Sequence, residues 1–261
     1  MPAPLTQLAL ALALALLAPA AGPTPAEKAF HLGQQALEGD RFDEAVGQFE
    51  LCLRLDPAHA QAHLSLAAAH LALGEDRLAA PHLGDYLAAR PDHFLVRMPY
   101  AELLARLERL AEAGHQLERF VEQAQEFPRI ADDHLIACHT RLMEIGEKQG
   151  DEYTERLHRG IGLYLLAQKR LDLGGAGAAR LAEELLCKAA AELTLARMYR
   201  PDEARPCWYL HGVWARLGQQ QPAVKWLRAA QESAGLSYLT PAEGRELHLA
   251  GRLRELESSK R

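Results

Sequence analysis

The sequence has few β-branched residues and no asparagine. It contains 4 Ile, 5 Val and 6 Thr among 261 residues, whereas Ala, Leu, Glu, Gln and Arg dominate. Sheets favour the residues that are scarce here, and helices favour those that are abundant. The composition therefore predicts an all-α protein.

The chain also lacks an excess of positive charge. Its net charge is -6, and its Arg and Lys residues are scattered among Asp and Glu. A surface for nucleic acid requires a basic patch or stripe, so no nucleic-acid partner is expected. The 23 Arg against 6 Lys, together with abundant Ala, suggest a GC-rich bacterial genome.

Long apolar runs are missing except near the start, where Leu8 to Ala18 alternates Leu and Ala. This run is shorter than the roughly 20 residues that span a bilayer. The small residues of Pro19 to Gly22 follow it, which is typical of a signal-peptide cleavage site. We therefore expect residues 1–22 to be a signal peptide and the mature chain to be exported, periplasmic or extracellular, with no membrane span. A frayed helix is the alternative, because the first residues lack Lys and Arg.

Metal and catalytic motifs are absent. The four cysteines lie far apart without a C-x-x-C pair, which excludes a zinc ribbon. We expect them to be reduced and buried, and two disulfides in an exported chain are the alternative. Two histidine pairs, His59 with His63 and His134 with His139, have near-helical spacing but lack the Glu of H-E-x-x-H. No nucleophile motif or phosphate loop is present. No metal site, no cofactor and no catalytic residue is expected, so the chain is predicted not to be an enzyme.

An internal repeat is present near the start. The segments Ala26 to Pro57 and Ala60 to Pro91 superpose without a gap at a spacing of 34 residues. The first segment places a Leu-Gly pair, an apolar opening residue, a small residue, an aromatic and a terminal proline at set offsets, namely Leu32-Gly33, Phe42, Ala45, Phe49 and Pro57. Small residues such as Gly33 and Ala45 allow two antiparallel helices to approach closely.

This pattern resembles the tetratricopeptide repeat. The resemblance implies an all-α, right-handed helical solenoid of antiparallel helix pairs, in which the first helices line a concave groove for peptides or partner domains. It implies no catalysis.

Further helix pairs are expected downstream. Tyr100 to Ala113 and His115 to Phe127 predict a pair with its turn at Gly114, and Pro128 lies 37 residues after Pro91, which predicts a three-residue insertion. We expect repeats over 26–128, a degenerate helix pair over 129–173, a glycine-rich hinge over 174–177 and a C-terminal repeat unit with a capping helix over 178–261. The glycines favour either a long turn or a boundary between subdomains.

The resemblance places a peptide groove on the first helices of the first two repeats. Its expected lining is mixed and partly apolar: Glu27, Phe30, His31, Gln34, Leu37, Gln61, Leu64 and Ser65. The Lys and Asn residues with which some family members clamp a terminal carboxylate are missing at these positions. The leading hypothesis is therefore an exported scaffold that binds a protein or peptide. Two alternatives remain: a ligand-binding or enzymatic site within 130–199, and a self-assembling structural repeat protein.

Overall fold

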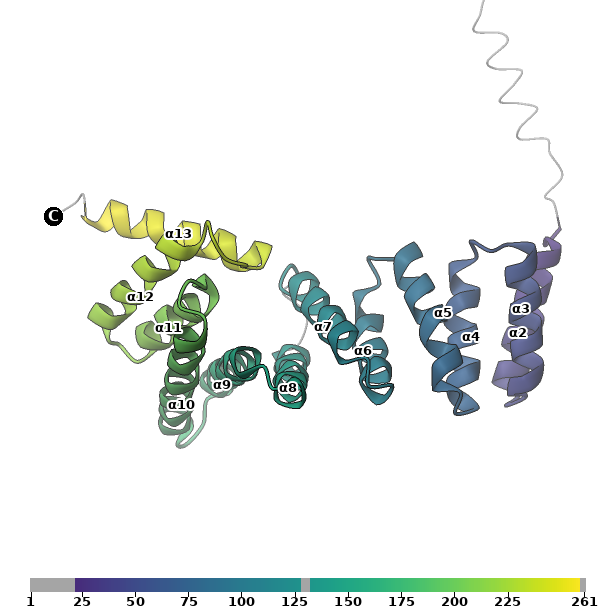
Figure 1. Cartoon of the computed structure of the whole chain (residues 1–261), viewed down its shortest axis with the longest axis horizontal. Helices are drawn as coiled ribbons and strands as arrows, with labels where there is room; N and C mark the ends of the chain where they lie inside the picture. Colours follow the sequence, from purple (N-terminus) through teal and green to yellow (C-terminus); the bar gives the residue numbers. More distant parts are fainter. Residues whose placement is uncertain (1–21, 128–131, 259–261) are drawn as a thin grey trace, which may run out of the picture. The chain divides into compact units, whose positions relative to one another are not determined.

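The computed structural model describes residues 22–127 and 132–258 and consists of helices joined by turns (Figure 1). No strand occurs among these residues. The predicted all-α fold is therefore confirmed. The predicted signal peptide, apart from Gly22, and the predicted repeat boundary at residue 128 lie outside the described residues.

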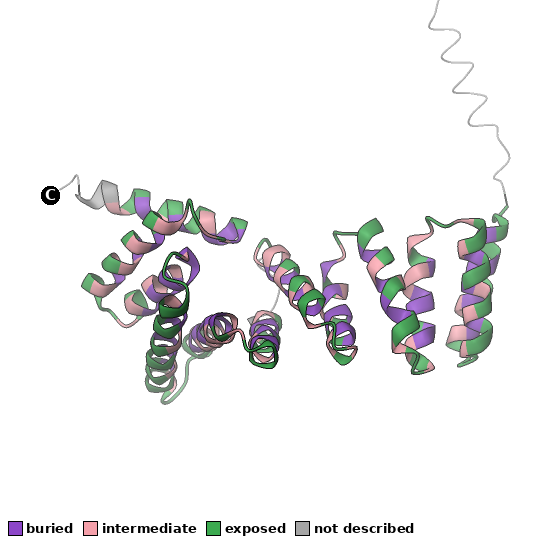
Figure 2. Cartoon of the chain, viewed as in Figure 1, coloured by how far each residue is buried: buried purple, intermediate pink, exposed green. Residues whose placement is uncertain are grey.

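The helices fall into two compact units, which divide between Asp92 and His93. The first unit holds two helix pairs, α2 (Pro25–Glu38) with α3 (Phe42–Leu55), and α4 (Ala60–Ala72) with α5 (Asp76–Ala89). Buried residues occupy the helix faces that pack against each other (Figure 2). A core around Phe49, Cys52 and Leu66 joins the first three of these helices.

The second unit begins with a 3-10 turn, η1 (Phe94–Val96), and continues with eight helices in its described part. They are α6 (Arg97–Arg106), α7 (Leu110–Ala124), α8 (Asp132–Gln149), α9 (Glu152–Leu173), α10 (Ala178–Tyr199), α11 (Ala204–Arg216), α12 (Gln220–Ser233) and α13 (Pro241–Ser258). One of its cores is shared by α9, α10 and α11, with Ile161, Leu193 and Leu210 fully buried.

The turns within the first three helix pairs repeat every 34 residues. Asp40, Gly74 and Glu108 each have a positive φ, of 55°, 74° and 59°. In each turn the next residue donates its N–H to the carbonyl five positions back, as Arg109 does to Leu104 at 2.9 Å. Asp40 and Glu108 adopt a left-handed conformation that usually belongs to glycine. The backbone of the turn is therefore kept although its residue type changes.

The expected turn at Gly114 is wrong. The chain turns at Leu107 to Arg109, and Gly114 lies inside α7. A Cβ at Gly114 would approach the Cγ2 atom of Ile145 on α8 to 3.9 Å, so this glycine lies at a helix contact. The third pair thus keeps the 34-residue period to its end, and the additional residues follow α7 instead of lying inside the pair.

The glycine-rich segment 174–177 connects α9 to α10. Gly174, Gly175 and Gly177 have φ values of 65°, 99° and 79°, and the two helices share one buried core across this connection. Of the two alternatives, a turn between packed helices describes the segment better than a boundary between subdomains.

The thiols differ in burial. Cys52, Cys138 and Cys207 are buried as expected, and burial raises the pKa of each of the three. Cys187 is exposed on α10, so the expectation of burial was wrong for this residue. No helix in the described ranges is long and apolar enough to cross a membrane.

Candidate binding groove

The predicted groove residues of the first unit lie on α2 and α4 but differ in accessibility. Glu27, His31 and Gln61 are exposed, while Gln34, Leu37 and Leu64 are half-buried. The carboxylate of Glu27 accepts from the backbone N–H of Thr24 at 2.6 Å and completes the N-terminal cap of α2. The Glu27 side chain therefore stabilises the N-terminus of α2.

Two of the predicted residues offer little surface. Phe30 is 9% exposed and packs its ring on Phe49 and His59, with ring centroids 5.8 Å and 4.6 Å away. Ser65 is 8% exposed. Sequence offsets alone do not distinguish a groove floor from a core position, because both lie on the inner side of the helix. A binding role for the eight residues stays a prediction.

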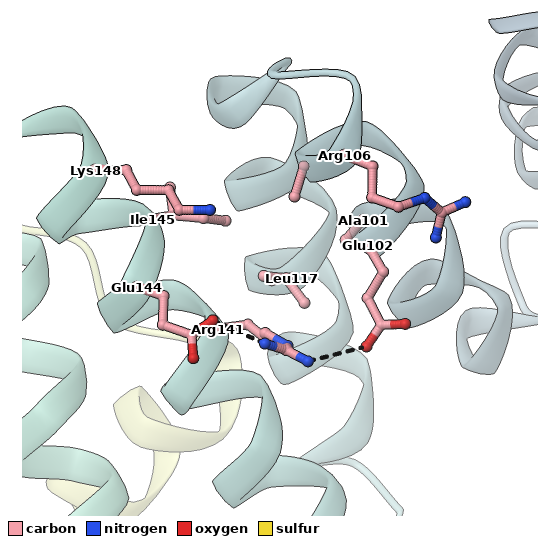
Figure 3. Close-up of a pocket in the computed structure, with 9 residues that line it drawn as sticks. Ala101, Glu102, Arg106, Leu117, Arg141, Glu144, Ile145 and Lys148 are labelled. Atoms are coloured by element: carbon pink, nitrogen blue, oxygen red, sulfur yellow. Dashed lines mark hydrogen bonds and ion pairs between the residues drawn. The ribbon is translucent and has the colours of Figure 1, made fainter. Parts of the chain in front are cut away.

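A cavity of about 330 Å³ lies between α6 and α8 in the second unit, with α7 behind it (Figure 3). Its lining combines small or apolar residues with charged ones: Ala101, Glu102, Ala105, Arg106, Leu117, Arg141, Glu144, Ile145 and Lys148. Ala101, Leu117 and Ile145 are buried. The apolar floor and charged rim form a concave surface of the kind that holds a peptide segment.

The charges on the rim are organised around Arg141. Its guanidinium contacts Glu144 on its own helix at 2.8 Å and Glu102 on α6 at 3.8 Å (Figure 3). The hydrogen bond that Arg141 donates to Glu144 raises the pKa of Arg141 above its usual value. Arg106 and Lys148 add positive charge on α6 and α8. These partly exposed ion pairs contribute little to stability, so a ligand can displace them.

The cavity has the register of the predicted groove. Glu102 and Ala105 lie 68 residues, or two repeat periods, after Gln34 and Leu37. The sequence did not place Glu102 and Ala105 in the groove, because Pro128 lies 37 and not 34 residues after Pro91 and so indicated an insertion within the third pair. The buried Ala113 and Leu117, at 68 residues after Ala45 and Phe49, are the signal that would have found them.

A pair of facing residues recurs 19 positions apart within the helix pairs. In the second pair, Nδ1 of His63 lies 3.1 Å from Nδ1 of His82. In the third pair, the guanidinium of Arg97 donates to the side-chain oxygen Oε1 of Gln116 at 2.7 Å. The corresponding residues of the first pair are Ala29 and Gln48. The methyl side chain of Ala29 cannot donate a hydrogen bond, and the buried Oε1 atom of Gln48 has no partner among the described residues.

The pair made by α8 and α9 repeats the histidine arrangement. Nδ1 of His139 lies 2.9 Å from Nδ1 of His158, and Nε2 of His158 lies 3.0 Å from Glu118 on α7. Both rings are buried. His134 and His139, which have near-helical spacing in the sequence, do not face each other: His134 is exposed, while His139 faces α9.

A buried ion network continues from this pair to the last helix. Arg205 on α11 contacts Glu118 at 3.2 Å and Glu243 on α13 at 3.0 Å, and the hydroxyl of Tyr209 donates to Glu243 at 2.8 Å. Glu243 also receives the Thr240 backbone N–H at 3.0 Å. The network therefore fastens α7, α9, α11 and α13 together.

The contacts within this network shift the pKa values of Glu118 and His139. Burial alone would raise the pKa of Glu118, but Arg205 and His158 outweigh it and hold that pKa well below the usual value. Burial lowers the pKa of His139, and the neighbouring His158 and Arg205 lower it further. The buried polar groups of this network contact one another, except that the Nη2 atom of Arg205 has no partner among the described residues. None of these contacts has the geometry of a nucleophile with its base.

No protein-family model and no curated protein matches the chain. Among solved structures it is similar to MamA protein, with 13% identity, coverage of 80% of this chain and 91% of that one, and a TM-score of 0.42. PilW, described as a widely conserved type IV pilus biogenesis factor, has 17% identity, coverage of 85% and 98%, and a TM-score of 0.37. YrrB, described as a TPR protein with an unusual peptide-binding site, has 14% identity, coverage of 86% and 90%, and a TM-score of 0.35. At these identities and scores, the matches carry no argument about function.

The sequence and structure of the chain themselves show the repeat. The left-handed turn residue recurs every 34 residues, and small residues recur at the helix crossings, where Ala45, Ala79 and Ala113 are fully buried. Sequence motif and geometry agree over three successive helix pairs. The pairs α2 with α3, α4 with α5 and α6 with α7 are helical repeats that resemble tetratricopeptide repeats in period, turn geometry and crossing residues.

Proposed function

We propose that the chain is a protein-binding scaffold that holds a short segment of a partner in the groove between α6 and α8. The observation that carries this is the cavity in Figure 3, in which a buried floor of Ala101, Leu117 and Ile145 is bordered by charges of both signs. An apolar floor supplies affinity, and the charged rim selects the register and direction of the bound segment.

The preferred segment follows from the rim. The lining of the cavity includes three cationic side chains, Arg106, Arg141 and Lys148, and two carboxylates, Glu102 and Glu144. A small apolar side chain flanked by acidic residues matches this surface, since a cavity of about 330 Å³ is at the lower end of the range for ligand pockets. Binding, and not catalysis, is the role that this lining supports.

Selection from a displayed peptide library tests the groove. We expect enriched peptides to carry an apolar residue beside Asp or Glu, and Ala105→Trp to weaken them by at least about ten-fold because the indole fills the cavity. Ala191→Trp is the matched control, because Ala191 is exposed on α10 and outside the groove. Failure to enrich any peptide, or equal binding by Ala105→Trp, would overturn the proposal.

We also propose that the scaffold acts after export into the bacterial envelope. The apolar run from Leu8 to Ala18 and the small residues that follow it support this. Amino-terminal sequencing of the protein recovered from the envelope fraction of its host should show that residues 1 to about 22 are absent. Recovery with Met1 intact, or recovery only from the cytoplasmic fraction, would contradict export.

A further inference from the structure

Three potential metal-ligand residues meet between α4 and α5. Nδ1 of His63 lies 3.1 Å from Nδ1 of His82 and 3.7 Å from the Asp85 carboxylate. One ligand atom from each residue lies within 4.8 Å of the others. Metal–ligand bonds of about 2.0–2.2 Å in a tetrahedral site separate ligand atoms by about 3.4 Å. The two measured distances lie on either side of that value.

The surroundings of His63 leave its Nδ1 atom available. The Nε2 atom of His63 lies 3.4 Å from the carbonyl oxygen of Pro57. That carbonyl can only accept, so it favours the tautomer in which Nε2 carries the proton and Nδ1 holds a lone pair. A backbone carbonyl on the distant nitrogen is a common way of orienting a metal-binding histidine.

The neighbours of His82 hold its ring in place. The ring of His70 is stacked on it, with centroids 5.9 Å apart and an interplanar angle of 6°, and Nδ1 of His70 is fixed by Glu75 at 2.7 Å. These contacts keep the imidazole of His82 beside that of His63.

The second histidine pair shows what distinguishes this cluster. His139 and His158 occupy the same relative positions, 19 residues apart, and have the same Nδ1 to Nδ1 contact. Asp85 comes three residues after His82, whereas Ile161 comes three residues after His158. Among the described residues, only His63, His82 and Asp85 form a group of three potential ligands. The carboxylate beside His158, that of Glu118, contacts Nε2 and not the Nδ1 atom that faces His139, whereas the ligand atoms of His63, His82 and Asp85 lie close to one another.

We propose that His63, His82 and Asp85 bind one divalent transition-metal ion, with Zn²⁺ as the reference ion. Two imidazoles and one carboxylate suit zinc and its neighbours in the first transition row, whereas Mg²⁺ and Ca²⁺ require oxygen ligands. Three protein ligands leave one coordination position for water or for a side chain of a partner. The ion joins α4 to α5, so its binding stabilises the first unit.

Titration of the untagged full-length chain with Zn²⁺ tests this site. A Cys187→Ser background removes the exposed thiol, which would otherwise bind zinc by itself. We expect one equivalent of Zn²⁺ to bind and to raise the melting temperature, and Mg²⁺ to do neither. Co²⁺ should give the visible absorption of a four-coordinate ion.

Two variants locate the ion. Asp85 is exposed, so Asp85→Asn should fold normally and weaken Zn²⁺ binding by at least about ten-fold; His82→Gln should weaken it further. His31→Gln, which removes an exposed histidine outside the cluster, should bind like the parent. The proposal is overturned if the parent binds no stoichiometric Zn²⁺ or if Asp85→Asn binds it equally well. Because the peptide groove lies in the other unit, either result leaves the proposed function untouched.

Discussion

Gly33 on α2 lies directly against the ring of Phe49 on α3. A Cβ atom at Gly33 would stand 2.6 Å from the Cε1 atom of Phe49, closer than two carbon atoms can approach without displacement. The ring is fully buried, so it has little space into which it can move. The pair thus sets how closely the two helices of the first repeat approach.

Gly33→Ala is expected to destabilise the first unit by about 1–3 kcal/mol, because overpacking outweighs the better helix propensity of alanine. Gly47→Ala provides the matched control. Gly47 is exposed on α3 and a Cβ there would meet nothing within 4 Å, so this change should stabilise by up to about 1 kcal/mol. Urea unfolding of both variants measures the difference, and equal effects would show that the close approach is unimportant.

Ala45→Leu should also destabilise the first repeat, by about 1–3 kcal/mol. Ala45 is fully buried where α3 meets α2, whereas Ala68 is exposed on α4 and should tolerate the same change. Hydrogen exchange measured segment by segment should show lost protection over residues 25–55, with the α9, α10 and α11 core unaffected, because repeats are stabilised mainly by their neighbours. Unchanged protection over 25–55 would count against the proposed register.

Glu243→Gln is expected to destabilise the second unit by about 3–5 kcal/mol, because it leaves the buried Arg205 without one of its two carboxylates. The comparison is Glu126→Gln, which breaks the exposed ion pair with Arg245 and should change the free energy of unfolding by less than about 1 kcal/mol. Chemical denaturation distinguishes the two. Similar small losses would mean that water solvates Arg205 in solution.

Acidification should weaken the fold in the range where unfolded histidine titrates. The pKa of His139 in the folded chain is well below the ordinary histidine value of 6.5, so below that pH the unfolded state binds a proton that the folded state does not. Stability is present above pH 6.5 and declines as the pH falls, by at most about 1.4 kcal/mol per pH unit for this group. His158, Glu118 and Arg205 are the charged or titratable groups that act on it.

His139→Gln removes this titration. The free energy of unfolding, measured between pH 7 and pH 5, should have a smaller slope in this variant than in the parent. Replacing the exposed His248 by Gln should leave the slope unchanged. Below the ordinary glutamate pKa of 4.5, the parent and the His139→Gln variant should both lose stability again, because the pKa of the folded Glu118 is lowered and the unfolded state gains the proton first.

The repeat was predictable because its signals are local. A glycine and an alanine at helix crossings, with an aromatic between them, can be identified within one 34-residue segment. The buried network could not be predicted, since Arg205 meets Glu118 across 87 positions and Glu243 across 38, and neither residue type in isolation predicts burial. The groove between α6 and α8 was missed for a smaller reason: Pro128 was used as the register marker although Ala113 and Leu117 carried the period.

The facing pair 19 residues apart has a consequence for how such a chain can change over time. Each pair has one residue on each helix of a single hairpin, and the fold accepts alanine with glutamine, arginine with glutamine, or two histidines at these positions. The residues at these two positions can therefore vary while the rest of the hairpin keeps its structure. A duplicated hairpin can acquire a new polar chemistry there through one or two substitutions, while the turn and the helix crossing that define the hairpin are inherited intact.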